Sequence, residues 1–368
     1  MRSKEQDIGV PEPRANPELE GHGGAEKLLL DAYLRGQLAH SLLLVGPRGI
    51  GKATLAYRFA RFVLNHGREQ VLDPGLFGTV PAPPTSLYVD PASPIFRRVM
   101  AGGHADLLTI EPHVDEKTGK RRSEIVVDDV RAIGPFLSLT PAEGGWRVVV
   151  IDSADDLNRN AANAVLKVLE EPPRRSLLLL VSHNPGRLLA TIRSRCRRMV
   201  LKPLAEAPIA ALVRGHHPEI SAEDALLLAR LAEGSAGRAL ALAQEGGIEL
   251  HRDVESLLQS LPKIDVVGLH AFSDRLARSG AEETFATAME LLRWWLSRLI
   301  RVRAGQGPGP QAPEAAWIPS LALAASLDRW LQVWEKISRL LARTESVNLD
   351  RKQVVLNVFL ALEDAVRS

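Results

Sequence analysis

The pattern of apolar and polar positions divides the chain into a first part with strands and helices and a second part with helices alone. The apolar run Ser41–Val45 leads into a glycine-rich loop and then into a stretch of helical spacing that ends near His66. A buried strand followed by a loop and a helix is the beginning of a β-α-β unit. A short amphipathic helix is predicted before it, over Ala25–Leu34. The first part is therefore expected to be an α/β domain.

Further apolar runs predict the rest of the sheet. They are Asp106–Glu111, Glu124–Val127, Arg147–Ile151 and Leu177–Val181. Three of the four are uninterrupted enough to be strands buried on both faces, as in a parallel sheet covered by helices. Between the last two lies NRNAANAVLKVLEEPP, whose apolar residues fall on one helical face and whose two prolines end the helix.

Strand patterns end after Leu201, and the remainder has helical spacing. We expect a flexible N-terminal tail over residues 1–20 and an α/β domain over residues 21–202. A small helical domain should follow over residues 203–248, and a larger helical domain over residues 249–368. The predicted fold class is thus α/β plus all-α.

Three segments are expected to be irregular. Residues 67–105 are rich in proline and should form loops with at most short helices. The charged stretch around Lys117–Lys120 suggests an exposed turn, and Ala304–Pro313 suggests a flexible connection between helices.

Composition narrows the possible functions. The net charge of +2 gives no overall basic bias, so contact with nucleic acid would need a local patch. Cys196 is the only cysteine, which excludes a disulfide within the chain and a cysteine-based zinc site. No apolar run is long enough for a signal peptide or a membrane span, so a cytoplasmic protein without membrane contact is expected.

The loop after the first strand matches the phosphate-binding pattern GxxxxGK. Gly46, Gly49 and Gly51 let successive backbone N–H groups point into one concavity, and Lys52 can reach the β- and γ-phosphates of ATP or ADP. The alternative is a glycine-rich turn with a helix-capping lysine. The position between a strand and a helix favours the phosphate loop.

One metal ligand is missing from this motif. The residue after the lysine is normally Ser or Thr, whose hydroxyl binds Mg²⁺, but here it is Ala53. Thr54 follows, yet one step along a helix turns the side chain by about 100°. Thr54 is a candidate nucleotide-binding residue, but it cannot simply replace the lost ligand, which argues against metal-assisted hydrolysis.

The run VVVID has the form of a Walker B strand, in which Asp152 would hold Mg²⁺ through water. ATPases of this type usually carry Glu next, to polarise the attacking water, but here the residue is Ser153. A serine is not a useful general base without a partner. Asp155 and Asp156 are interpreted as carboxylates at a helix N-terminus. Two catalytic features are therefore absent.

These motifs together resemble bacterial clamp-loader subunits of the AAA+ type. The most diagnostic segments are NAANAVLKVLEEPP and the following SRC, residues 194–196. GPRGIGKATLAYRFAR, PASPIFRRVMAGGHADLLTIEP and NLDRKQVVLNVFLAL are similar to the delta-prime type of DNA polymerase III subunit. The resemblance covers most of residues 20–368. It implies an AAA+ P-loop domain with a parallel sheet, a small helical lid and a C-terminal helical collar.

The resemblance also implies roles for three residues. Arg195 would be an arginine finger that reaches the ATP site of a neighbouring subunit, Asn184 a sensor-1 residue and Arg238 a sensor-2 residue. The alternative for Arg195 is a place in an exposed basic loop. The alternative for Asn184 is a strand-end turn, and for Arg238 a solvent-facing position on a helix. Many relatives carry a four-cysteine zinc module after the phosphate-loop helix, but residues 67–105 contain no cysteine.

The function implied is that of a largely non-hydrolysing stator in the clamp loader of the DNA polymerase III holoenzyme. Gamma/tau and delta subunits would complete a hetero-pentamer that places the sliding clamp on primer-template DNA. No independent catalysis is expected, because no polymerase active site is visible. The alternatives are an ATP-hydrolysing motor subunit of the gamma/tau type and a regulator that binds DNA or protein and merely retains a P-loop.

Overall fold

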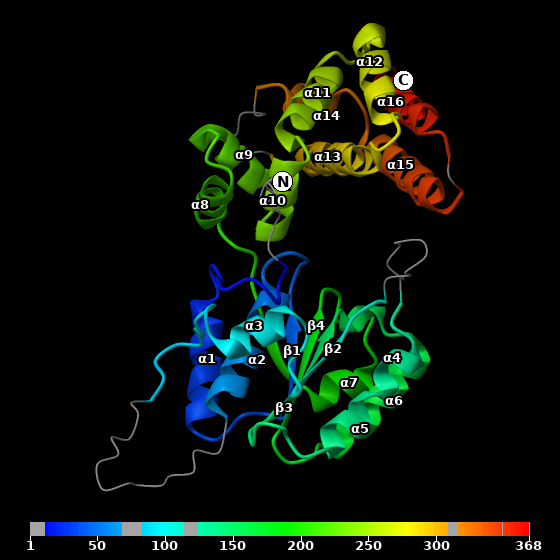
Figure 1. Ribbon diagram of the computed structural model, residues 1–368. Coiled ribbons are helices and arrows are strands. Elements are labelled where there is room, and N and C mark those ends of the chain that lie inside the picture. The colour runs from blue at the N-terminus through cyan, green and yellow to red at the C-terminus, as the bar shows by residue number, and fades with distance from the viewer. Residues whose placement is uncertain (1–11, 68–82, 114–123, 308–315, 348, 368) are drawn as a thin grey trace, which may run out of the picture. The chain divides into compact units, whose positions relative to one another are not determined.

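The computed structural model describes residues 12–67, 83–113, 124–307, 316–347 and 349–367 (Figure 1). These residues form two compact units. Unit 1 comprises residues up to Leu212 together with Glu233–Arg238, and unit 2 comprises Val213–Ala232 and the residues from Ala239 onward. The turn predicted around Lys117–Lys120 lies outside the described residues, as do residues 1–11 of the predicted tail and residues 308–313 of the predicted connection.

A five-stranded parallel sheet forms the centre of unit 1, with the strand order β2-β3-β4-β1-β5. The strands are β1 (Ser41–Val45), β2 (Leu107–Ile110), β3 (Arg147–Asp152), β4 (Ser176–Ser182) and β5 (Arg197–Val200). The three inner strands β1, β3 and β4 are almost entirely buried, as their unbroken apolar runs predict. The prediction of an α/β domain with a parallel sheet is confirmed.

Helices cover both faces of this sheet and make two hydrophobic cores. Helices α1 (Gly23–Leu34), α2 (Lys52–His66) and α3 (Pro94–Met100) pack on one face. The opposite face carries α4 (Val127–Arg131), α5 (Ile133–Ser138), α6 (Arg159–Glu170) and α7 (Ala190–Arg195). Alternate residues of each inner strand contribute to the two cores, since successive side chains point to opposite faces of a sheet.

Strand β5 is not predicted by the sequence pattern. Its sequence, RRMV, is mostly exposed, because it lies at one edge of the sheet and pairs only with β1 among the described strands. Charged side chains are common on edge strands, where they discourage pairing with other chains.

Residues 124–127 are the apolar run that forms no strand. Ile125 makes a single bridge to Leu157, and α4 begins at Val127. The Asp129 carboxylate accepts a hydrogen bond from the Val126 N–H group at 2.8 Å, which stabilises the start of the helix.

Residues 12–20, the described part of the predicted tail, pack against the rest of unit 1. The buried Arg61 side chain on α2 donates hydrogen bonds to the carbonyl oxygens of Arg14 and Asn16, at 2.8 and 2.7 Å. The Arg14 guanidinium in turn lies 2.9 Å from Glu111 at the end of β2.

Unit 2 and the connecting segments are helical. The helices are α8 (Glu206–His216), α9 (Ala222–Leu231), α10 (Ala236–Gln244), α11 (Gly247–Gln259), α12 (Val266–Leu276), α13 (Glu282–Arg303), α14 (Ile318–Leu323), α15 (Leu327–Val347) and α16 (Arg351–Arg367). Helix α13 is the central element and contacts α11, α14 and α15. Trp295 on α13 is buried against Trp294 and Trp317.

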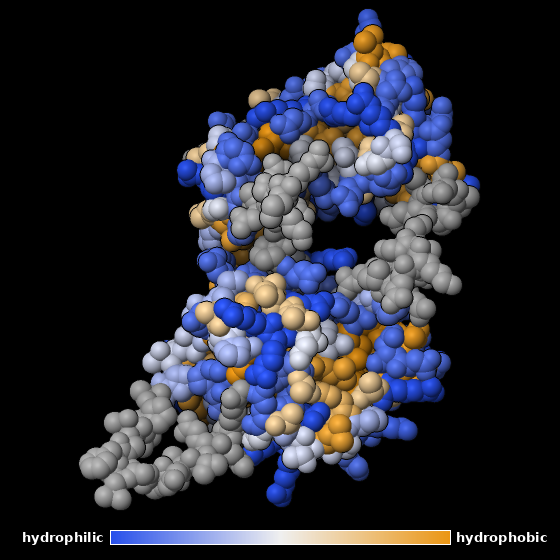
Figure 2. Space-filling model, in the orientation of Figure 1, coloured by the Kyte–Doolittle hydropathy of each residue, from blue (hydrophilic) through white to orange (hydrophobic). Residues whose placement is uncertain are grey.

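The visible surface is mostly hydrophilic, with an apolar area over the region of β2 and α7 (Figure 2). No helix within the described ranges is both long and apolar enough to cross a membrane.

Candidate nucleotide site

The phosphate loop connects β1 to α2 at the carboxyl end of the sheet. Gly49 and Gly51 have φ angles of +73° and +100°, in the left-handed region that favours glycine. Gly51 is the N-cap of α2, and Lys52 is the first residue of this helix. The backbone N–H groups at this end of α2 carry the partial positive charge that suits a phosphate.

Lys52 is only 2% exposed and donates a hydrogen bond to the carbonyl oxygen of Pro47 in its own loop. Burial lowers the pKa of Lys52 to about 8, although Asp152 and Asp155 act in the opposite direction. The ammonium group is thus poorly hydrated in this arrangement, and an anion bound in the loop would stabilise its charge.

The segment that carries Arg238 lies against the same loop. The Gly237 N–H group donates to the Gly49 carbonyl oxygen at 2.9 Å, and a Cβ added at Gly49 would come within 2.3 Å of Ser235 Oγ. The Arg238 N–H group donates to Ser235 Oγ at 3.2 Å. Arg238 therefore lies in the first turn of α10, next to the phosphate loop, and its role as a phosphate contact stays a prediction.

The N-terminal segment approaches the loop from another direction. His22 Nε2 lies 2.6 Å from the Ile50 carbonyl oxygen and is buried. A Cβ added at Gly51 would lie 3.0 Å from Leu19 Cδ1. Gly51 is therefore needed both for its φ angle and for this close approach.

Side chains from the ends of β3 and β4 meet next to the loop. Ser153 Oγ lies 3.0 Å from His183 Nε2. Asp155 is buried and accepts hydrogen bonds from the Ser182 hydroxyl, at 2.7 Å, and from the His183 backbone N–H group. Asp155 therefore ties the ends of the two strands together, which the sequence interpretation as a helix-terminal carboxylate did not foresee.

His183 is neutral at physiological pH. Burial, followed by the positive charges of Lys52 and Arg48, lowers its pKa to about 4. Its Nδ1 atom is buried and has no hydrogen-bond partner among the described residues. The imidazole ring can therefore act toward a ligand only through the Ser153 hydroxyl.

The residues present do not suit a magnesium ion. Asp152 ends β3 as expected for a Walker B carboxylate, but Ala53 offers no oxygen and Thr54 is buried within α2. No group of three or more His, Cys, Asp or Glu side chains in the described ranges could hold a metal ion. The loop itself fits a phosphate, since it has the glycine geometry and the lysine.

Asn184 lies one residue beyond this cluster. Its side chain is exposed and accepts a hydrogen bond from the Gly186 N–H group at 3.2 Å, within a turn. The neighbouring His183, rather than Asn184, contacts Ser153. The sequence could have pointed to His183 only through its position directly after a buried strand.

Arg195 is far from this cluster in the topology. It ends α7 and precedes β5, so it lies at the amino end of the sheet, whereas the phosphate loop follows the carboxyl end of β1. Its guanidinium is exposed, 2.7 Å from Glu170 Oε1 and 3.1 Å from the Thr191 carbonyl oxygen. Its backbone is fixed by Ser41, whose hydroxyl donates to the Arg195 carbonyl oxygen at 2.9 Å. Arg195 cannot act in its own phosphate loop.

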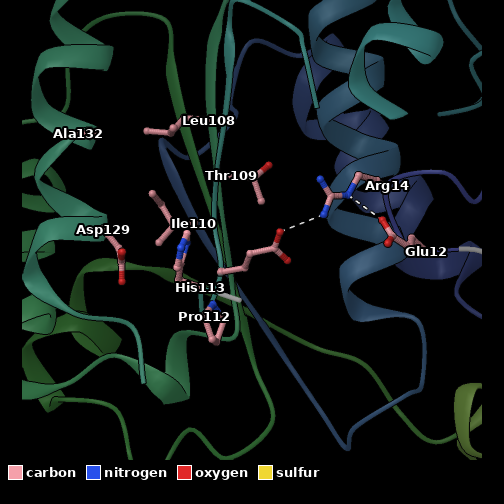
Figure 3. A pocket seen from close by; sticks show the side chains of 10 residues that line it. Glu12, Arg14, Leu108, Thr109, Ile110, Pro112, His113, Asp129 and Ala132 are labelled. Atoms are coloured by element: carbon pink, nitrogen blue, oxygen red, sulfur yellow. Dashed lines mark hydrogen bonds and ion pairs between the residues drawn. The ribbon is translucent and has the colours of Figure 1, made fainter. Parts of the chain in front are cut away.

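A separate cavity of about 540 Å³ lies along the edge strand β2 (Figure 3). Arg14 lies on one side of it, 3.0 Å from Glu12 and 2.9 Å from Glu111. None of the predicted site residues lines this cavity.

Known proteins to which this chain is similar include subunits of DNA polymerase III. A family model described as "DNA polymerase III, delta subunit" matches residues 21–205. The DNA polymerase III subunit delta' of Pseudomonas aeruginosa is 36% identical over 230 residues, which cover 62% of this chain and 63% of that protein. The subunit delta' of Escherichia coli is 33% identical over 246 residues, 66% of each chain. The subunit tau of Escherichia coli is 29% identical over 237 residues, 63% of this chain and 33% of that protein. The match thus spans just under two thirds of the length of these delta' proteins.

Proposed function

This chain belongs to the family described as "DNA polymerase III, delta subunit", and we propose that it is a clamp-loader subunit that completes a neighbour's ATP site. In this role it hydrolyses little or no ATP itself and supplies Arg195 in trans. The observation that carries the proposal is the position of Arg195, exposed at the end of the sheet opposite the chain's own phosphate loop.

The chemistry of an arginine finger suits Arg195. A guanidinium from a neighbouring subunit stabilises the negative charge that develops on the transferred phosphoryl group. The Arg195 side chain is held by an ion pair to a half-exposed carboxylate, Glu170, and by a hydrogen bond to the Thr191 carbonyl oxygen, and surface contacts of this kind cost little to break. Its backbone is fixed at β5, so the side chain can change partner while its origin stays in place.

The chain's own site lacks the groups that activate water. Ser153 replaces the usual carboxylate and is bonded to the neutral His183. A proton taken from water would have to reach the imidazole through Ser153, and burial together with Lys52 opposes the charged imidazolium. The pair therefore does not replace a carboxylate base.

Binding of ATP or ADP without hydrolysis is part of the proposal. The nucleotide would supply phosphate charge to the loop, where backbone N–H groups and Lys52 would hold it and Arg238 would lie close by. A bound phosphate would replace the Pro47 carbonyl oxygen as the partner of Lys52. Its negative charge would then compensate the charge of the buried ammonium group. Ala53 leaves the magnesium position without a hydroxyl, so no step is assigned to a metal.

The proposed partners are gamma/tau and delta subunits in a hetero-pentamer, with the sliding clamp and primer-template DNA bound by the assembly. Support comes from the relatives, which carry the names of delta' and tau subunits of DNA polymerase III. Such an assembly would work in the cytoplasm.

A motor subunit of the tau type is the second candidate, favoured by the 29% identity to a tau subunit. It requires that another group replace the lost metal ligand and that another base replace the missing glutamate. Ala53 and Ser153 count against it, because Ala53 offers no hydroxyl to the metal and Ser153 offers no carboxylate to the attacking water.

Arg195→Ala tests the proposal in a reconstituted loader, with ATP hydrolysis measured at saturating concentrations of this chain. Removing an arginine finger costs on the order of 10³-fold at the site that it completes. We therefore expect the ATP hydrolysis rate of the whole loader to fall by the fraction that this one site contributes. Arg193→Ala is the matched control, because Arg193 lies on the same helix and is also exposed.

The isolated chain should show negligible ATP turnover. Robust turnover by the purified chain, or a loader rate unchanged by Arg195→Ala, would overturn the proposal. Binding of a fluorescent ATP analogue with and without Mg²⁺, compared with Lys52→Ala, measures the nucleotide part separately.

A further inference from the structure

A shallow groove of about 270 Å³ lies between α1 and the edge strand β5 in unit 1. Its lining is largely apolar and includes Leu28 and Ala32 from α1 and Met199 and Val200 from β5. This groove plays no part in the phosphate site, which lies at the carboxyl end of the sheet.

Two of the apolar side chains in the groove are well exposed. Leu28 is 61% exposed and Val200 is 59% exposed. Single exposed apolar residues are common on protein surfaces and need no explanation. Here, however, two of them line one hollow, so a partner that filled it would remove both from water together.

The groove also has a strand edge that pairs with no other strand in the part of the chain that the structure describes. The Leu201 N–H group donates to the Val45 carbonyl oxygen, at 2.8 Å. Successive N–H groups along β5 point alternately toward β1 and away from it, and this bond fixes which ones point toward β1. By this alternation the N–H groups of Arg198 and Val200 face away from β1. An unpaired strand edge is a site where another chain can bind.

The charge of the groove has one sign. Arg197 and Arg198 are exposed and line it, and its lining includes no carboxylate. A partner segment that is apolar with flanking Asp or Glu residues would therefore match it.

One end of the groove lies close to the backbone of Arg195. Arg197 is two residues further along the chain, and the hydroxyl of Ser41 on β1, the neighbour of β5, holds the Arg195 carbonyl oxygen. A protein that receives the Arg195 side chain is thus brought to this groove as well. Edge protection alone would explain the two arginines but not the exposed Leu28 and Val200 beside them.

We propose that the α1/β5 groove binds an apolar segment with flanking carboxylates on the ATPase subunit whose nucleotide site receives Arg195. This inference rests on the proposed function, since it takes its partner from the role of Arg195. The groove supplies affinity and orientation, whereas Arg195 supplies the charge for the reaction.

The test is the affinity of the full chain for a purified tau-type ATPase subunit, measured by surface-based or fluorescence titration at fixed ionic strength. Leu28→Asp combined with Val200→Asp should raise the dissociation constant at least tenfold. Arg197→Glu combined with Arg198→Glu should have a similar effect and weaken the salt dependence of binding. Leu139→Asp is the control, because Leu139 is 62% exposed and follows α5 on the other face of the sheet.

The arginine pair keeps the test valid should the apolar double variant fail to fold, since both arginines are exposed. Dissociation constants within twofold of the unmodified chain for the arginine double variant would overturn the inference. A loss of affinity in Leu139→Asp as large as in the groove variants would also overturn it.

The two proposals fail separately. Arg195→Ala should lower the hydrolysis rate at saturation while the affinity stays within twofold. The groove variants should lower the affinity, and the hydrolysis rate should recover when the chain is added in excess. Tight binding by the groove variants contradicts only the groove, and an unchanged rate in Arg195→Ala contradicts only the arginine finger.

Discussion

The two ends of the sheet in unit 1 are built in opposite ways. At the carboxyl end, Lys52, Ser153 and Asp155 are buried, and each makes a hydrogen bond to another group of the same chain. At the amino end, Arg195 is exposed and held by an ion pair with Glu170. Of the two cations suited to phosphate, Lys52 is buried and Arg195 is exposed to the solvent.

Burial explains why the two cations, Lys52 and Arg195, differ in their ability to reach a phosphate on another protein. A buried cation is desolvated, and its pKa falls, as it does for Lys52. An exposed guanidinium keeps its hydration and its charge, so it can move to a phosphate on another protein at small cost. The side chains beside the phosphate loop are thus bonded within the chain, whereas the guanidinium of Arg195 is exposed at the other end of the sheet.

The largest expected effect concerns Asp155. Asp155→Ala would leave the buried donors of Ser182 and His183 without an acceptor, and should lower the free energy of unfolding by about 3 kcal/mol. Urea denaturation at pH 7 measures this. Asp156→Ala is the control beside it, and Arg195→Ala is the counterpart at the other end of the sheet. Both should change the stability by about 0.5 kcal/mol or less, and an equal loss in all three variants would remove the contrast.

The second prediction is a pH dependence. The pKa of Lys52 is about 8 in the folded chain against 10.5 ordinarily, so between these values the unfolded chain binds a proton that the folded chain does not. The Lys52 contribution to stability therefore rises with pH across this window. Lys52→Met should stabilise the chain relative to the unmodified protein at pH 7.5, and this advantage should shrink by about 2 kcal/mol by pH 9.5.

Urea denaturation at the two pH values measures the Lys52 difference directly. Lys27→Met, at an exposed position on α1, is the matched control and should show no such trend. A Lys52→Met advantage that did not vary with pH would mean that the ammonium group is better solvated than its burial indicates.

The smallest expected effect concerns Gly49. Gly49→Ala would strain a φ of +73° and also bring its Cβ within 2.3 Å of Ser235 Oγ. Gly144→Ala is a close control, because its φ is +72° and no atom lies within 4 Å of the added Cβ. Both should lose about 1 kcal/mol through backbone strain. The free energy of unfolding of Gly49→Ala should fall by about 1 kcal/mol more, because the new Cβ displaces the segment around Ser235. Thermal denaturation measures both losses, and equal losses would show that Ser235 moves aside freely.

The sequence pattern predicted the inner part of the fold well. The strands β1, β3 and β4 are buried on both faces, so they consist mostly of apolar residues. Such continuous apolar runs can be recognised in the sequence as buried strands. Strand β5 has the sequence RRMV, because an edge strand contacts solvent, and its pattern carries no such signal. Residues 124–127 show the converse, since an apolar run there supports a helix start.

Four features were readable from the sequence: the phosphate loop, the missing hydroxyl at Ala53, the missing carboxylate at Ser153 and the family to which the chain is similar. These depend on residue type and on spacing along the chain, which a sequence displays directly. Only the tertiary structure brought His183 to Ser153, placed Asp155 between two strand ends and set Arg195 at the opposite end of the sheet. The contacts of Ser153 and Asp155 join residues that are 27 to 30 positions apart, and their partners are fixed by strand order and packing rather than by any local pattern.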